Sequence, residues 1–281
     1  MARFALYGQQ ELVPLQAFAA GLDLLGHDYL WREHSFWTHA PRDFDAVVIY
    51  GLRGQGRDIA KHYADRNIPL IVLDHGYMRR VHVLADYETG YFQIGIGRLG
   101  WTPAVAPDAA RFESLGVEIK QRDPRPMRRA MIAGQTPFDA SHHRTEAQLR
   151  MAYTILDEQL RERGLRTTFR PHPKGQAVRP PIQPDGIRTL DAALADADLV
   201  ATINSNSGLD ALLAGLPVVT LQPCHYTELS YRWPVPLAVI QPPKPDRLRG
   251  FLERLAWAQW TADEMREGLP QTFLASIGAI P

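Results

Sequence analysis

The chain has 281 residues, of which 45% are hydrophobic and 22% are charged. This is the composition of an ordinary globular protein, and the length suits one large domain or two of ordinary size. The 31 Lys and Arg balance the 31 Asp and Glu, and a net charge of zero argues against holding nucleic acid mainly by bulk electrostatics. The one cysteine, Cys224, excludes an intrachain disulfide and fits a reducing compartment.

The sequence carries no recognisable targeting or membrane segment. Its N-terminal residues lack the long apolar region and the small-residue cleavage site of a secretory signal. The longest mostly apolar stretch, Leu209 to Leu221, contains Asp210 and is too short to span a bilayer. We therefore expect a cytoplasmic protein without a membrane span.

Short apolar runs alternate with helical patterns through the first half of the chain. Runs that are too short for helices predict strands over 2–7, 45–50 and 69–73. Apolar residues at helical spacing predict helices over 12–25 and 58–66. Strands that are apolar throughout and separated by helices indicate a parallel sheet covered on both faces.

The same alternation restarts near Met131. It predicts strands over 130–133, 167–170, 199–203 and 218–221. Helical spacing predicts a long helix within 141–164 and shorter helices over 191–195, 209–214 and 248–257. The fold class is therefore α/β, with two parallel-sheet domains.

A segment rich in proline and arginine, 121–129, separates the two halves. Two prolines and four arginines within nine residues are typical of a linker. The arginines are interpreted as a solvated hinge, with a basic lip on an interdomain cleft as the alternative. We expect an N-terminal α/β domain over 1–124, a second over 125–245, and C-terminal helices over 246–281.

A small polar loop joins a buried strand to a helix in the second half. Ser207 and Asp210 have the S-x-x-D spacing of a capped helix N-terminus. Backbone N–H groups and the positive end of the helix dipole would then face the carboxyl edge of the sheet, which is a natural phosphate site. The alternative is a capped turn without a ligand. The candidate residues are Asn204, Ser205, Asn206, Ser207 and Gly208.

His172 follows another strand, in the segment Phe169-Arg-Pro-His-Pro-Lys174. The two flanking prolines restrict its backbone, and Arg170 and Lys174 lie beside it in the sequence. A rigid imidazole there suits contact with a phosphate, and as imidazolium it could neutralise a phosphorylated leaving group. The alternative is a packed loop histidine. The strand order suggests that His172 and the polar loop share one sheet edge.

A third strand–loop–helix segment spans 131–143. Gln135 and Asp139 could form hydrogen bonds with a base or a sugar. The alternative is a capped turn in which Asp139 or Ser141 is the cap.

Together these three segments resemble the capsule-polysaccharide glycosyltransferases, which are the bacterial Kdo transferases and polysialyltransferases of the GT-B fold. The resemblance covers about residues 129–221 and rests on Gly-Gln135, Arg-Pro-His172-Pro and Asn-Ser205-Asn-Ser207-Gly-Leu-Asp-Ala-Leu. In that family an HP motif and a Ser/Thr motif bind the phosphate of the nucleotide-sugar. By resemblance those roles fall on His172, Ser205 and Ser207. The resemblance also implies two Rossmann-like domains facing a cleft, with the C-terminal helices crossing back towards the N-terminal domain.

The N-terminal half resembles the family less closely. Leu73-Asp-His-Gly76 is similar to the acidic–acidic–glycine motif that supplies the catalytic base, but His75 stands where a second acid is expected. The base is therefore Asp74, His75 or Glu88. A cap or turn role is the alternative for Asp74.

The stretch Tyr87–Trp101 combines aromatic residues with glycines and suits an acceptor-binding loop, with core aromatics as the alternative. A nucleic-acid acceptor would need a basic groove with aromatic rings to stack on a flipped base. The arginines that would line such a groove are Arg79, Arg80, Arg122, Arg125, Arg128 and Arg129.

Three other features resemble functional motifs but lack a residue, a position or a spacing that the function requires. The glycines of 51–56 have P-loop spacing, but Arg57-Asp58 replaces the required Lys-Ser/Thr. Asp196-Ala-Asp198 matches a metal-binding D-x-D but precedes its strand, at the wrong edge of the sheet. The ten histidines show no zinc-binding spacing.

The leading interpretation is a glycosyltransferase that moves a sugar from a nucleotide-activated donor to an acceptor hydroxyl. It is expected to need no metal, and no cofactor besides the nucleotide-sugar as co-substrate. The acceptor is either a glycan or a hydroxymethylated base in phage DNA. The alternative is a non-catalytic nucleotide- or sugar-phosphate-binding α/β protein. The sequence defines neither the donor sugar nor the oligomeric state.

Overall fold

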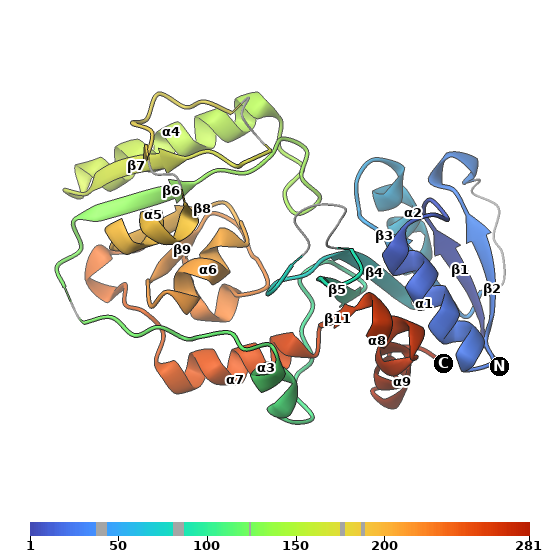
Figure 1. Ribbon diagram of the computed structural model, residues 1–281. Coiled ribbons are helices and arrows are strands. Elements are labelled where there is room, and N and C mark those ends of the chain that lie inside the picture. The colour runs from blue at the N-terminus through green and yellow to red at the C-terminus, as the bar shows by residue number, and fades with distance from the viewer. Residues whose placement is uncertain (38–43, 81–86, 124, 175–177, 187–188) are drawn as a thin grey trace. The chain divides into compact units, whose positions relative to one another are not determined.

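The chain folds into two compact units (Figure 1). The computed structural model describes residues 1–37, 44–80, 87–123, 125–174, 178–186 and 189–281. The first unit combines Met1–Val117 with Leu252–Pro281, and the second is Glu118–Phe251. Each unit is a Rossmann-like α/β fold built around its own sheet.

The first unit contains a six-stranded sheet in the order β11-β5-β4-β3-β1-β2. Its strands are β1 (Arg3–Tyr7), β2 (Asp28–Arg32), β3 (Ala46–Tyr50), β4 (Leu70–His75), β5 (Tyr91–Ile96) and β11 (Gln259–Thr261). The first four are mutually parallel, whereas β5 runs antiparallel to β4, and β11 runs antiparallel to β5. The sheet is therefore mainly parallel, as expected, with two antiparallel strands at one edge.

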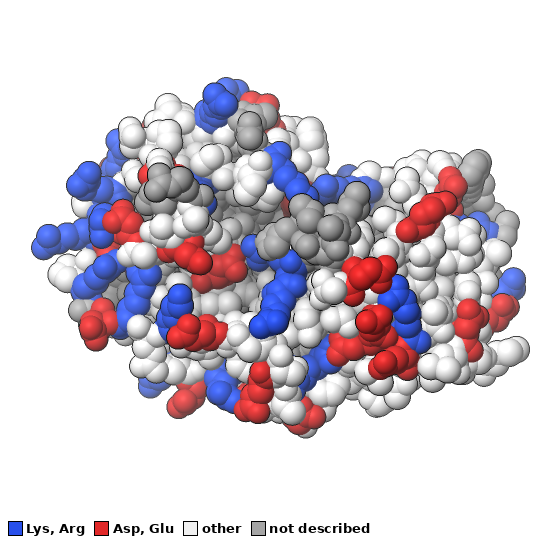
Figure 2. Space-filling model, in the orientation of Figure 1, with Lys and Arg blue, Asp and Glu red and all other residues white. Residues whose placement is uncertain are grey.

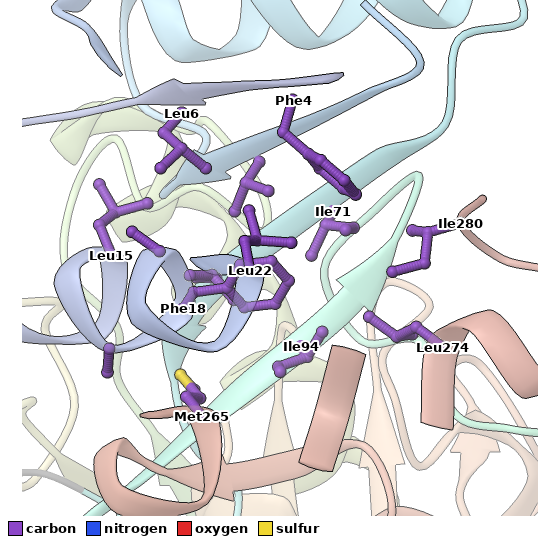
Figure 3. Close-up of a cluster of buried hydrophobic side chains, with 14 of the residues drawn as sticks. Phe4, Leu6, Leu15, Phe18, Leu22, Ile71, Ile94, Met265, Leu274 and Ile280 are labelled. Carbon is purple, nitrogen blue, oxygen red and sulfur yellow. The ribbon is translucent and has the colours of Figure 1, made fainter. Parts of the chain in front are cut away.

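Helices cover both faces of this sheet. Alternate side chains of β1 point to opposite faces, so Phe4 and Leu6 belong to one core cluster while Ala5 and Tyr7 belong to the other. The first cluster also takes residues from α1, α8 and α9, and the second takes residues from α2 (Figure 3). The helices are α1 (Val13–Leu24), α2 (Gln55–Ala64), α3 (Ala110–Ser114), α8 (Ala262–Arg266) and α9 (Leu269–Ser276).

The last helices pack closely against α1. A Cβ added at Gly21 would lie 2.1 Å from the carbonyl oxygen of Met265, so only glycine allows this approach. The buried Gln271 secures the contact, because its Nε2 donates to the carbonyl oxygens of Phe18 at 2.8 Å and of Met265 at 3.1 Å. Residues that are far apart in the sequence thus share one core.

The second unit contains a five-stranded parallel sheet in the order β10-β9-β8-β6-β7. Its strands are β6 (Arg129–Ala133), β7 (Arg166–Arg170), β8 (Leu199–Thr202), β9 (Val218–Thr220) and β10 (Tyr231–Arg232). Its helices are α4 (Glu146–Glu162), α5 (Leu190–Asp196) and α6 (Ser207–Leu213), and α7 (Pro245–Ala256) leads into the first unit. Within the described ranges, no helix is long and apolar enough to cross a membrane.

Most strands and helices expected from the sequence are confirmed to within a few residues, but the interpretation of Tyr87–Trp101 as an acceptor-binding loop is wrong. The stretch contains β5, and its Phe92 is fully buried in the first core cluster. Gly95 is needed because the carbonyl oxygen of Arg98 would lie 2.0 Å from a Cβ at that position. Gly95 therefore serves close packing of a strand, and Phe92, Tyr87 and Trp101 pack in or against the core.

Candidate functional site

The strand order of the second unit brings three candidate loops to one edge of its sheet. β6 pairs with β7 on one side and with β8 on the other. Ala133 of β6 lies level with Arg170 of β7 and Thr202 of β8, so the three strands end together. Where the strand order reverses in this way, the loops leaving the carboxyl ends diverge and form a ligand crevice. The expectation that His172 and the 204–208 loop share one edge is confirmed.

Two buried amides connect the loops that follow β6 and β8. Gln135 Nε2 donates to Asn204 Oδ1 at 2.8 Å, and the backbone N–H of Asn204 donates to Gln135 Oε1 at 3.0 Å. The two residues are only 6% and 7% exposed. We call this pair the amide clasp. Both the oxygen and the nitrogen of the Gln135 amide are thus bonded within the protein, and they join the two loops.

Asp139 and Ser141 extend the amide clasp. Asn204 Nδ2 donates to the carbonyl oxygen of Ser141 at 3.0 Å, and Asn204 Oδ1 lies 3.0 Å from Ser141 Oγ. Asp139 Oδ1 accepts from the backbone N–H of Ser141 at 2.9 Å and from its hydroxyl at 2.7 Å. Asp139 therefore closes the turn, which was the alternative interpretation of this segment.

Ser207 is the first residue of α6 and is not its cap. The N-cap residue is Asn206, and its side chain makes no capping hydrogen bond. Ser205 Oγ accepts the backbone N–H of Ser207 at 3.2 Å instead. The S-x-x-D interpretation is therefore wrong, because a hydroxyl two residues earlier takes the place of the expected cap. The half-exposed Ser207 hydroxyl remains as a donor at the edge of the site.

Tyr226 fixes the backbone of the 204–208 loop. It lies outside the three sequence motifs, which therefore did not predict this role. Its hydroxyl donates to the carbonyl oxygen of Ser205 at 2.5 Å. Burial raises the pKa of the Tyr226 phenol well above its usual value, so the phenol remains a donor. A Cβ on Gly208 would lie 2.0 Å from the Tyr226 hydroxyl oxygen, which explains the glycine.

His172 is half-buried, and its tautomer follows from one contact. Its Nδ1 accepts the backbone N–H of Lys174 at 3.0 Å. A nitrogen that accepts a hydrogen bond carries no proton, so the neutral ring has its proton on Nε2. His172 can therefore donate to a phosphate oxygen while neutral, and the imidazolium form would have to break the Lys174 contact.

The Arg170 guanidinium forms an ion pair within the protein. Its Nη1 lies 2.6 Å from Asp185 Oδ2, and their side chains are 19% and 8% exposed. This buried ion pair joins the end of β7 to the segment beside it, so the expected contact of Arg170 with a phosphate is not supported. Lys174, by contrast, is exposed.

The linker arginines lie at the opposite, amino edge of the second sheet. Arg122 donates to the carbonyl oxygens of Leu194 and Ala197, at the C-terminal end of α5. Arg125 Nε lies 2.5 Å from Asp198 Oδ1. The other oxygen of Asp198 accepts two backbone N–H groups of the linker, those of Arg128 and Arg129, each at 2.9 Å.

The linker is therefore fixed to the sheet, and neither the hinge nor the basic-lip interpretation describes it. The acidic pair of 196–198 is used in these contacts, at the amino edge as expected. In the part of the chain that the structure describes, no group of three or more His, Cys, Asp or Glu is placed to hold a metal ion.

In the first unit, Asp74 and His75 are the last two residues of β4. Asp74 Oδ1 accepts the backbone N–H of His75 at 2.7 Å. Burial is the main cause that raises the pKa of the Tyr50 and Tyr77 phenols, and the negative charge of Asp74 adds to it. Asp74 is therefore a half-buried carboxylate among tyrosines at a strand end.

The other two candidates for the base are placed differently. The His75 ring packs edge-on against Tyr87, with ring centroids 6.1 Å apart. Glu88 is exposed and forms an ion pair with Arg266 of α8, at 2.7 Å. The carboxylate of Glu88 is thus engaged at the surface, which leaves Asp74 and His75 as the candidates at the strand end.

Two Rossmann-like units, one with candidate ligand loops at its carboxyl edge, are the architecture of the GT-B fold. Solved structures of that fold resemble this chain over nearly its whole length. The chain therefore has the GT-B fold, and its family resemblance is borne out at the level of structure.

Two solved structures of this kind are Kdo transferases of KpsC from Thermosulfurimonas dismutans. The β-Kdo 2,4 transferase is 16% identical, with 92% of this chain and 90% of that chain covered and a TM-score of 0.55. The β-Kdo 2,7 transferase is 14% identical, with 96% and 99% covered and a TM-score of 0.55. No family model and no curated protein sequence matches the chain.

Proposed function

We propose that this protein is a glycosyltransferase that moves a sugar from a nucleotide-activated donor to an acceptor hydroxyl. The observation that carries the proposal is the amide clasp at the point where the strand order of the second unit reverses. A buried, fully bonded polar pair at such a point holds two loops in fixed positions around a crevice. The likeness to the two Kdo transferases supports the same assignment.

The donor phosphate would be bound by three groups of the second unit. These are the hydroxyl of Ser207, the Nε2–H of neutral His172 and the ammonium group of Lys174. When the bond between the sugar and the phosphate oxygen breaks, negative charge grows on that oxygen. Donors held in place before the reaction stabilise this charge, and we propose that no metal ion and no further cofactor is needed.

The acceptor would be activated in the first unit by Asp74. Its carboxylate takes the proton of the acceptor hydroxyl while that oxygen attacks the anomeric carbon, and the nucleotide leaves as the anion. His75 is the second candidate for this role. We place the enzyme in the cytoplasm, where nucleotide-sugars are the donors, and propose a glycan rather than DNA as the acceptor.

A non-catalytic nucleotide or sugar-phosphate binder is the second candidate function. His75 favours it, because it replaces one acid of the motif that supplies the base in the related family. Slow hydrolysis of the donor without acceptor separates the two candidates, since a protein that only binds the nucleotide leaves the donor intact.

The test is a panel of UDP-, CMP- and GDP-sugars, followed for hydrolysis and for nucleotide affinity. We expect one donor to be hydrolysed slowly. Ser207→Ala should bind its nucleotide about tenfold more weakly, which is the worth of one hydrogen bond to a charged group. Ser114→Ala, at an exposed serine of the first unit, is the matched control and should bind normally. Unchanged affinity in both Ser207→Ala and His172→Ala would refute the assignment.

A further inference from the structure

The carboxyl edge of the first unit contains a pocket that the proposed mechanism does not use. Its volume is about 470 Å³, within the range of small-molecule sites. It lies where β1 and β2 end, and the backbone N–H of Gly8 donates to the carbonyl oxygen of Arg32 at 3.0 Å to join the two strand ends. The residues that matter here are Gly8, Gln10, Glu11, Trp31, Arg32 and Glu33.

The pocket lies on the same sheet edge as Asp74. β1, β3 and β4 are neighbouring parallel strands, and their register keeps their carboxyl ends nearly level. Two strand spacings separate β1 from β4, which is about 10 Å. The pocket and the candidate base therefore lie on one sheet edge, and only a ligand of more than one sugar unit could contact both.

The indole of Trp31 forms one wall of the pocket, and Tyr29 packs against it. Its ring meets the Tyr29 ring edge-on at 6.1 Å, and the Tyr29 hydroxyl donates to Asp23 Oδ2 at 2.9 Å. Trp31 is half-buried, so part of its ring remains accessible. A fixed indole beside carboxylate and amide groups combines an apolar face with hydrogen-bonding groups, and a sugar ring presents the matching C–H face and hydroxyls.

The charges of the pocket favour an uncharged ligand. Glu11 and Glu33 give the pocket a net negative charge, because the guanidinium of Arg32 lies on the other face of the sheet, beside the core cluster that contains Phe44. Arg32 Nε is buried and makes no hydrogen bond within the described ranges, although the guanidinium lies 5.9 Å from the Phe44 ring. A polyanion would be repelled by the two carboxylates, whereas the hydroxyls of a neutral sugar can donate hydrogen bonds to them.

The rest of the molecule agrees with this preference. Arg122 and Arg125, two of the candidates for a nucleic-acid groove, are fixed to the amino edge of the second sheet. On the face seen in Figure 2, acidic and basic side chains are intermingled and form no single basic stripe. We infer that the pocket beside Trp31 binds an uncharged sugar of the acceptor. The acceptor role rests on the proposed function, whereas the binding of the sugar does not.

The test is a microarray of defined neutral and acidic oligosaccharides, probed with the full-length protein, together with a DNA duplex that contains hydroxymethylcytosine. We expect neutral glycans to be retained. Trp31→Ala should weaken their binding at least about tenfold, and Trp31→Phe should keep most of it because an aromatic face remains. Gln9→Ala, an exposed neighbour outside the pocket, is the matched control.

Two results would overturn the inference. One is retention of no neutral glycan, or retention that Trp31→Ala leaves unchanged in a variant with the thermal melting profile of the wild type. The other is binding of the DNA duplex that depends on Trp31. Donor hydrolysis is measured separately on the wild-type protein. Failure there, with glycan binding intact, contradicts the proposed transferase and leaves the sugar pocket in place.

Discussion

At the scale of single residues, hydrogen bonds within the protein decide which polar side chains remain for a ligand. Three motifs were expected at one sheet edge, and the structure brings their loops together there, but the motifs did not reveal the hydrogen bonds within the protein. Arg170 is engaged with Asp185, which is 15 residues later, and Gln135 is engaged with Asn204, which is 69 residues later. Such partners are not visible in local sequence patterns, so the sequence predicted which loops share an edge better than it predicted the hydrogen bonds between them.

The role of Gln135 can be tested by removing its amide. Gln135→Ala leaves the buried side chain of Asn204 with one partner fewer, which should cost about 1–3 kcal/mol of unfolding free energy. Nucleotide affinity should fall as well, because the 204–208 loop loses its support. Urea unfolding followed by the fluorescence of the second unit, alongside calorimetric titration, measures both effects. A loss of affinity with no loss of stability would instead make Gln135 a direct ligand contact.

The role of Asp74 can be tested by a substitution that keeps its shape. Asp74→Asn removes the basicity, and losing a general base typically costs about two to four powers of ten in rate. Nucleotide affinity should remain near the wild-type value, since Asp74 belongs to the first unit. Steady-state kinetics of sugar transfer provide the measurement.

His75→Ala and Glu88→Gln are the controls for Asp74. If Asp74→Asn keeps full activity while one of these variants loses it, that residue is the base. If all three variants transfer sugar at the wild-type rate, the catalytic part of the proposal is wrong.

At the scale of helices and strands, the sequence predicted most buried elements but missed β5 and the short or edge elements. β3 and β8 are continuous apolar runs and were expected almost to the residue. β2 was missed because it is an edge strand that begins and ends with a charged residue, and all of its residues are at least partly exposed. β11 has only three residues, which is too short for any periodicity to show.

The start of α6 depends on contact with a residue outside the helix, and this can be tested at Gly208. Gly208→Ala places a methyl group against the ring of Tyr226, which is itself fully buried. The helix must shift, so we expect a lower melting temperature and weaker nucleotide binding. Thermal melting with and without nucleotide measures both.

The matched control for Gly208 is another glycine within a helix. Gly250 of α7 has open space around the position of an added Cβ. Gly250→Ala should be neutral or stabilising by about 0.5–1 kcal/mol, because alanine is the better helix former. Equal effects of the two substitutions would mean that Tyr226 does not constrain α6.

At the scale of the whole molecule, strand–helix alternation was enough to predict two α/β folds. It could not predict that the chain after Leu252 belongs with the first unit, because helical periodicity shows that a face is buried but not what covers it. The structure supplies the partner: Met265 and Leu274 complete the core cluster that α1 begins (Figure 3). The family resemblance, rather than the periodicity, raised this expectation.

The central claim is that a donor nucleotide binds at the carboxyl edge of the second sheet, between β6 and β8. A crystal structure with the nucleotide of the hydrolysed donor tests it most directly. We expect that Ser207 Oγ and His172 Nε2 each lie within hydrogen-bond distance of a phosphate oxygen, and that the amide clasp is intact. A nucleotide bound at the edge of the first sheet, or one whose phosphates contact neither residue, would contradict the account.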